Sequence, residues 1–276
     1  SLGNKMKYYP AVIDNGSLAA ATALGPRRIL MSYHYFKSKQ KLIQDEVQKG
    51  TDIFLDSGAF SAMNLGKAID IDAYCNFIIL TGVRRYAVLD VIGDAQETYK
   101  NFLFMKSKYN LSPIPVFHMG GTEEELIRLL ECNYIALGGL VKSANIDNHL
   151  KKCWEIILKR PNPPKVHGFG LTNIEIMKKY PWASVDSSSF QGCRRFGRQL
   201  VLKDNFTFKT IKEQEFITFL EEKYMYDSKE LWENNKKRRY LEDFFAVNDM
   251  KVFVNYLTFV NKSKDFGYLT QQEQLF

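Results

Sequence analysis

The chain has 276 residues, of which 45% are hydrophobic and 25% charged, as is ordinary for one large globular domain or a domain with an appendage. It contains no apolar run long enough to span a bilayer, no signal-peptide pattern, and no CxxC pair among Cys75, Cys132, Cys153 and Cys193. The net charge of +7 and pI near 9.0 favour a polyanionic partner, and we expect a reduced, metal-free protein in the cytoplasm, away from membranes.

Short apolar runs rich in β-forming residues alternate with helical patterns between residues 27 and 186. Seven of these runs are predicted strands: 28–32, 53–55, 86–89, 114–117, 134–137, 166–169 and 183–185. An eighth strand is expected at either 9–13 or 200–202. Helix starts are indicated by capping pairs at Asp94 and Glu97, Thr122 and Glu125, and Thr172 and Glu175.

Repeated strand–helix units with short connections predict a parallel sheet. Neither GxGxxG nor GxxxxGK[ST] follows an early strand, which argues against a Rossmann or P-loop protein. The number of strands favours an α/β fold of the (β/α)8 barrel type over an open doubly wound sheet.

The alternation stops near residue 203. We therefore predict a barrel catalytic domain at 1–203 and a mainly helical region packed on it at 204–276. The basic run 236–239 lies in the second part and is more typical of a solvated helix face, although a phosphate-binding role stays open.

Polar residues and glycines follow the predicted strands, at the end where barrel enzymes carry their active sites. The segments, in chain order, are LDSGAF (55–60), VLDVIGD (88–94), VFHMGG (116–121), LGGLVKS (137–143), HGFGLTN (167–173) and SVDSSSF (184–190). One aspartate at a strand end is usually a helix cap or an ion-pair partner. Three of them, Asp56, Asp90 and Asp186, would converge on one mouth between glycine-rich loops that let a flat ligand approach the backbone.

Carboxylates without histidine or cysteine ligand spacing do not predict a metal site, and no cofactor is expected. One option is glycosidic chemistry, in which one carboxylate attacks an anomeric carbon and another handles a proton. Arg194, Arg195 and Arg198 in RRFGR follow Asp186 directly. They suit either phosphates beside the attacked sugar or a surface ion-pair network.

In this order, LDSGAF, LGGL, HGFGLTN, SVDSSSF and RRFGR resemble the tRNA-guanine transglycosylase superfamily over roughly residues 28 to 200. The closer similarity is to its phage-type DNA 7-deazaguanine transglycosylases. The resemblance implies exchange of guanine in DNA for a free 7-deazaguanine base such as preQ0 or preQ1, in the host cytoplasm if the chain is phage-encoded.

The resemblance also implies roles for individual residues. Asp186 matches the nucleophile that forms a covalent sugar ester, and Asp56 matches the acid–base carboxylate, with Ser57 and Gly58 beside it. The remaining matches concern recognition: Asp90, His118, Gly139 and Leu140 would bind the base, and Arg194, Arg195 and Arg198 the phosphates.

Several positions depart from the tRNA-acting members. No cysteine follows Cys193, so their zinc site is missing, which weakens tRNA as the alternative substrate. Ala59 stands where those enzymes have glycine, and His118 where bacterial members have a glutamine that reads the base.

Two other classes stay open: a non-catalytic nucleic-acid-binding barrel, and a small-molecule barrel enzyme such as an aldolase or N-glycosidase. His167, within or at the end of a predicted strand, is expected to be a hydrogen-bonded core histidine.

Overall fold

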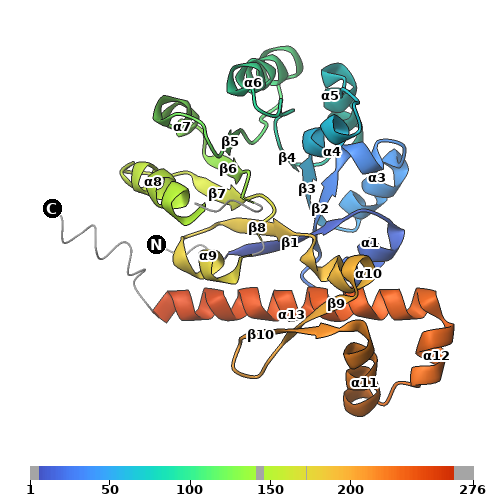
Figure 1. Ribbon diagram of the computed structural model, residues 1–276. Coiled ribbons are helices and arrows are strands. Elements are labelled where there is room, and N and C mark those ends of the chain that lie inside the picture. The colour runs from blue at the N-terminus through green and yellow to red at the C-terminus, as the bar shows by residue number, and fades with distance from the viewer. Residues whose placement is uncertain (1–5, 141–145, 172, 264–276) are drawn as a thin grey trace.

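The chain folds into a (β/α)8 barrel with a C-terminal, mainly helical region, as the sequence predicts (Figure 1). The computed structural model describes residues 6–140, 146–171 and 173–263. The barrel strands are β1 (Lys7–Val12), β2 (Arg28–Ser32), β3 (Asp52–Asp56), β4 (Arg85–Tyr86), β5 (Val116–His118), β6 (Tyr134–Gly138), β7 (Lys165–Gly168) and β8 (Ser184–Ser187). All their pairings are parallel, in the order β4-β3-β2-β1-β8-β7-β6-β5.

The ring is closed by a short contact between its two outermost strands, β4 and β5. Ala87 and Ile114 form a parallel bridge just beyond β4 and just before β5. The Val88 N–H donates to Ile114 O, and the Ile114 N–H donates to Tyr86 O, both at 2.9 Å. Residues 9–13, one of the two candidates for the eighth strand, overlap β1, whereas 200–202 lie outside the ring.

Helices connect the strands and surround the barrel (Figure 1). They are α1 (Asn15–Thr22), α2 (Tyr33–Phe36), α3 (Gln40–Gln48), α4 (Ala59–Asn64), α5 (Ile71–Thr81), α6 (Ala95–Tyr109), α7 (Glu123–Leu129), α8 (Ile146–Leu158) and α9 (Ile174–Lys179). The predicted caps Asp94 and Thr122 begin α6 and α7 by accepting backbone N–H bonds. The cap of α9 is Asn173, because its side chain accepts from Glu175 N and Ile176 N; Thr172 lies outside the described residues.

Alternation along β3 directs every second side chain into the barrel. The ring of Phe54 lies 4.4 Å from that of His167 on β7 and 5.9 Å from that of Tyr9 on β1. Strands β3 and β7 are not neighbours, so these rings meet inside the barrel. Asp52 and Asp56 lie two residues before and two residues after Phe54, so they face the same interior at opposite ends of the barrel. Asp52 accepts a hydrogen bond from the Tyr9 hydroxyl at 2.7 Å.

The region after β8 contains a hairpin, of which the sequence analysis indicated only residues 200–202 as a candidate strand. After β8 come a 3-10 turn, η1 (Ser189–Gln191), helix α10 (Gly192–Phe196), antiparallel strands β9 (Arg198–Leu202) and β10 (Phe208–Lys212), and helices α11 (Glu213–Tyr224), α12 (Ser228–Glu233) and α13 (Asn235–Ser263). The predicted boundary at residue 203 falls in the turn of this hairpin. Strand β10 is largely exposed, so its residues carry little of the alternation that marks a half-buried strand.

Helix α13 lies between the barrel and the hairpin with α11 and α12 (Figure 1). It packs against α1, β1 and η1. Its residues Ala246 and Val247 belong to one buried hydrophobic cluster of the barrel, and Phe253 and Leu257 belong to the other. Helix α13 is therefore part of the barrel core and also packs against the hairpin.

Candidate active site

The three aspartates predicted at strand ends lie near one another at the carboxyl-terminal mouth of the barrel. Asp56 ends β3, Asp186 lies in β8, and Asp90 follows β4. Burial, together with the negative charges of Asp186 and Asp90, raises the pKa of Asp56 to about 7, although backbone hydrogen bonds from Gly58 and Ser57 act to lower it. At neutral pH, Asp56 therefore exists in both its protonated and ionised forms.

One oxygen of Asp186 is held by two donors. Its Oδ1 accepts from the Gly170 N–H at 2.8 Å and lies 3.2 Å from His167 Nε2. Within the described residues, Oδ2 has no hydrogen-bond partner. Because the side chain is only 8% exposed, this arrangement fixes the carboxyl and leaves one oxygen available to react.

A chain of hydrogen bonds continues from Asp186 into the barrel. His167 is fully buried, and burial lowers its pKa, so it is a neutral imidazole with one N–H. Ionised Asp186 only accepts hydrogen bonds, which places that proton on Nε2; Nδ1 then accepts from Ser184 Oγ at 2.5 Å. Ser184 Oγ in turn lies 2.5 Å from the Tyr134 hydroxyl. His167 is the hydrogen-bonded core histidine that the sequence predicts, and its bond to Asp186 is the feature that sequence could not supply.

The loop after β3 is shaped by Gly58. Its φ of +76° belongs to the left-handed region, and a Cβ there would lie 2.3 Å from Ser32 Oγ and 2.5 Å from His34 Cβ. The Gly58 N–H donates to Asp56 Oδ2 at 3.0 Å. Ser57 is 1% exposed, and its Oγ accepts from the Ala59 N–H at 3.4 Å.

Asp90 and His118 form a pair on the far side of the mouth. His118 Nε2 is hydrogen-bonded to Asp90 Oδ2, and Thr98 Oγ1 donates to Asp90 Oδ1 at 3.1 Å. Burial lowers the pKa of His118, but the hydrogen bond and charge of Asp90, with the charge of Asp56, outweigh it and leave the pKa above its ordinary value. A Cβ at Gly138 would lie 2.8 Å from the imidazole, so glycine makes room for the ring.

The remaining residues predicted to bind a base lie on the loop after β6. Gly139 is exposed and has a φ of +74°, whereas the side chain of Leu140 is buried. This segment can therefore present its backbone, while the side chain of Leu140 packs inside. Residues 141–145 lie outside the described part of the chain.

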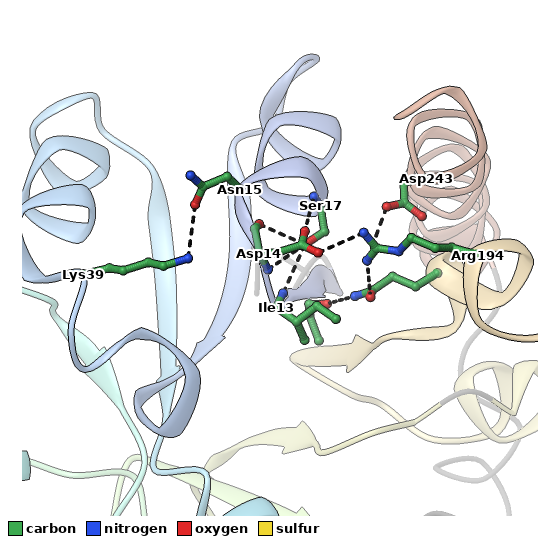
Figure 2. A network of polar contacts seen from close by, with 9 residues as sticks. Ile13, Asp14, Asn15, Ser17, Lys39, Arg194 and Asp243 are labelled. Atoms are coloured by element: carbon green, nitrogen blue, oxygen red, sulfur yellow. Dashed lines mark hydrogen bonds and ion pairs between the residues drawn. The ribbon is translucent and has the colours of Figure 1, made fainter. Parts of the chain in front are cut away.

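Arg194 takes part in an internal network that joins three elements (Figure 2). Its Nη1 donates at 2.9 Å to Oδ2 of Asp14, the residue that precedes α1. Its Nη2 donates to Gln191 Oε1 at 2.6 Å. Asp243 Oδ2, on α13, lies 3.6 Å from Nη2. The side chain is 15% exposed. Arg194 thus differs from its predicted role as a phosphate ligand and matches the alternative, an ion-pair network.

Arg195 and Arg198 are exposed and have no ion-pair partner within the described residues. Between them, Phe196 is 70% exposed, and the Arg195 guanidinium lies 5.3 Å from its ring centroid. Gly197, with a φ of +62°, ends α10 and turns the chain into β9. This tip combines two cations with an aromatic face, as surfaces that bind single-stranded nucleic acid commonly do.

The described residues contain no group of three or more His, Cys, Asp or Glu side chains placed to hold a metal ion. None of their helices is both long and apolar enough to cross a membrane.

Comparisons with known proteins identify no family for this chain. A scan against protein-family models gives no match, and a search of curated proteins gives none. A solved structure described as "Structural study of Project ID from Aquifex aeolicus VF5" aligns at 13% identity with a TM-score of 0.49, over 68% of this chain and 85% of that chain. The assignment of the barrel fold is therefore based on the strand pairing observed in this chain.

Proposed function

We propose that this protein is a pentosyltransferase that replaces guanine in DNA with a free 7-deazaguanine base through a covalent aspartyl–sugar intermediate. The observation that carries the proposal is the pair of carboxyls at one mouth in different environments. Asp186 has one oxygen fixed by Gly170 and His167, whereas burial and neighbouring charges raise the pKa of Asp56 to about 7. Environments that separate two carboxyls in this way suit one for attack and the other for proton transfer.

In the first half-reaction, Asp186 Oδ2 forms a bond to C1′ of the target deoxyguanosine as the bond from C1′ to the base nitrogen breaks. The electron pair of that bond goes to guanine, which takes a proton from the protonated form of Asp56. The products are free guanine and an Asp186–sugar ester.

In the second half-reaction, the incoming deazaguanine gives its ring N–H proton to ionised Asp56. Its nitrogen then attacks C1′ and displaces the Asp186 carboxylate, which restores the enzyme. Because Asp56 gives a proton in one half and takes it back in the other, a pKa near the working pH serves both steps.

Two features support recognition of base and backbone. Asp90 and His118 offer polar atoms beside the exposed backbone of Gly139, where the edge of a flat base can be read. Each oxygen of Asp90 already accepts one hydrogen bond and keeps capacity for another. Arg195 and Arg198 hold no internal partner within the described residues and remain free for phosphates. The target nucleotide has to leave the base stack to reach this mouth.

The test is incorporation of radiolabelled guanine into a polynucleotide. Wild-type protein is incubated with duplex DNA, single-stranded DNA or tRNA, and the label retained in the polymer is measured. Incorporation into DNA supports the proposal, and incorporation confined to tRNA would make the protein a tRNA-acting transglycosylase. No incorporation into any of them, together with tight DNA binding, would leave a non-catalytic nucleic-acid-binding barrel.

A further inference from the structure

A basic groove lies beside the mouth, between the first turns of α1 and α13. Its volume is about 580 Å³, and its lining includes Asn15, Arg194, Lys236, Arg239 and Asp243. Arg194 and the network of Figure 2 form the wall that joins the two helices. The Arg194 side chain of the groove is therefore held in place by its hydrogen bonds and ion pairs.

Two cationic side chains of the groove are not paired with an acidic side chain of the described residues. Lys236 and Arg239 are exposed and form no ion pair with any described residue. Their neighbours differ: Lys237 pairs with Glu230 at 2.6 Å, and Arg238 with Glu213 at 2.9 Å. The basic run 236–239 is thus divided, with two residues tied to acids and two left available at the groove.

Asp243 also lines the groove. It is 1% exposed, and its Oδ1 is buried without a hydrogen-bond partner among the described residues. Burial raises the pKa of Asp243 to about 7, so at neutral pH its carboxyl opposes the charges of Lys236 and Arg239 less than an ordinary aspartate would.

The groove is connected to the reacting centre through residues that follow Asp186. Asp186 pairs with Tyr9 in the β1–β8 register, and Gln191 Nε2 donates to Ala11 O at 2.8 Å. Gln191 also accepts from Arg194, which lines the groove. Gln191, five residues after Asp186 in the chain, therefore links the end of β1 to Arg194 in the groove wall.

We propose that this groove binds a phosphodiester of the polynucleotide backbone next to the nucleotide whose sugar Asp186 attacks. Lys236 and Arg239 contact the phosphate oxygens, near the positive end of the dipole of the 29-residue helix α13. The inference rests on the proposed function in one respect, namely that the neighbouring nucleotide is the one that Asp186 attacks. The binding of a phosphodiester in the groove does not depend on it. The groove thus adds its cations to those of the tip at Arg195 and Arg198.

The test is a salt titration of binding to a fluorescent single-stranded DNA oligonucleotide, and to an RNA of the same length. The variant Lys236→Ala/Arg239→Ala removes both groove cations. The matched control is Lys203→Ala/Lys209→Ala, which removes two exposed hairpin lysines that form no ion pair with a described residue. Both double variants lower the net charge by two, so a difference between them reports position. Gln replacements at 236 and 239, with thermal unfolding of every variant, separate lost contacts from lost folding.

We expect the groove variant to bind DNA at least about tenfold more weakly near 0.1 M salt, and its log–log salt slope to fall by about 1.4, from roughly 0.7 per lost single-strand contact. The control should keep the wild-type slope. Equal slopes for the two double variants would overturn the proposal. A groove-dependent slope with RNA alone would keep the phosphodiester site and make the polymer RNA.

Failure of this inference and failure of the proposed function give different results. Asp186→Asn should bind DNA with the wild-type slope, because it lies outside the groove. Groove-dependent binding without any base exchange would refute the transglycosylase and leave the groove. Base exchange with an unchanged slope in the groove variant would refute the groove and leave the enzyme.

Discussion

His167 Nε2 lies 3.2 Å from Asp186 Oδ1, and the histidine itself is completely buried between β3 and β8 inside the barrel. The carboxylate at the mouth is thereby attached to a hydrogen-bonded chain that continues through Ser184 to Tyr134. In the proposed reaction, His167 is therefore a positioning residue, which orients the Asp186 carboxylate from inside the barrel.

His167→Phe should lower the rate of the first half-reaction by about 10- to 100-fold, because it removes one hydrogen bond to a charged group, worth about 1.5–3 kcal/mol. The KM for the free base should change little. His167→Gln, whose amide N–H can still donate to Asp186, should recover much of the rate. Single-turnover measurements check this. Equal losses for Phe and Gln, in step with their losses of thermal stability, would make His167 merely structural.

Asp56→Asn should depress exchange by about 100-fold or more, since the amide can neither give nor take the proton. Its effect on stability should depend on pH. The pKa of Asp56 rises from 3.8 in the unfolded chain to about 7 in the fold, so its contribution is favourable at low pH and is lost as pH rises through 7. The melting temperature of Asp56→Asn, relative to wild type, should therefore increase between pH 4 and pH 8. A difference that is constant with pH would contradict the shifted pKa.

Asp90→Asn should chiefly weaken binding of the free base, because one of the two acceptor oxygens becomes an N–H donor and His118 loses its charged partner. The raised pKa of His118 should fall at the same time. For the wild-type protein, kcat/KM for the free base should change with pH at a midpoint above 6.5. In Asp90→Asn this midpoint should move to lower pH. An unchanged midpoint would show that His118 is not the group observed.

The three arginines of RRFGR should separate into two classes. Arg194→Ala should destabilise the fold by about 2–4 kcal/mol, because Asp14 and the buried Asp243 lose their partner. Arg195→Ala and Arg198→Ala should change stability by less than about 0.5 kcal/mol, as is usual at exposed positions. Each should instead lower DNA affinity and reduce the log–log salt slope by roughly 0.7. Chemical denaturation and binding titrations distinguish the classes, and a destabilising Arg195→Ala would contradict them.

The barrel and the placement of its strand-end residues could be predicted because both follow from local patterns. Residues 28–32 coincide with β2. Asp56 and Asp186 follow the apolar residues of their strands, and the alternation of side chains along a strand fixes which of them face inward. Residues 200–202 lie in β9, but strand β10 was missed, since it is mostly exposed and its side chains show no clear alternation.

The role of Arg194 depends on contacts that no local pattern contains. Asp14 lies 180 residues away along the chain, and the two meet only because β1 and β8 are neighbours in the closed ring. The partner of Asp186 was equally hidden. A buried histidine in a strand is ordinary, and only the register of β7 against β8 places His167 beside the carboxylate.

The central claim, that Asp186 forms a covalent bond to a sugar, is tested most directly by trapping the intermediate. Wild-type protein and guanine-containing DNA are mixed without free base, quenched in denaturant and digested, and the modified peptide is identified by mass spectrometry. We predict a DNA adduct on Asp186 that disappears when free guanine is added before the quench, and no adduct with Asp186→Asn. Base exchange that proceeds at a normal rate in Asp186→Asn, or an adduct on another residue, would contradict the account.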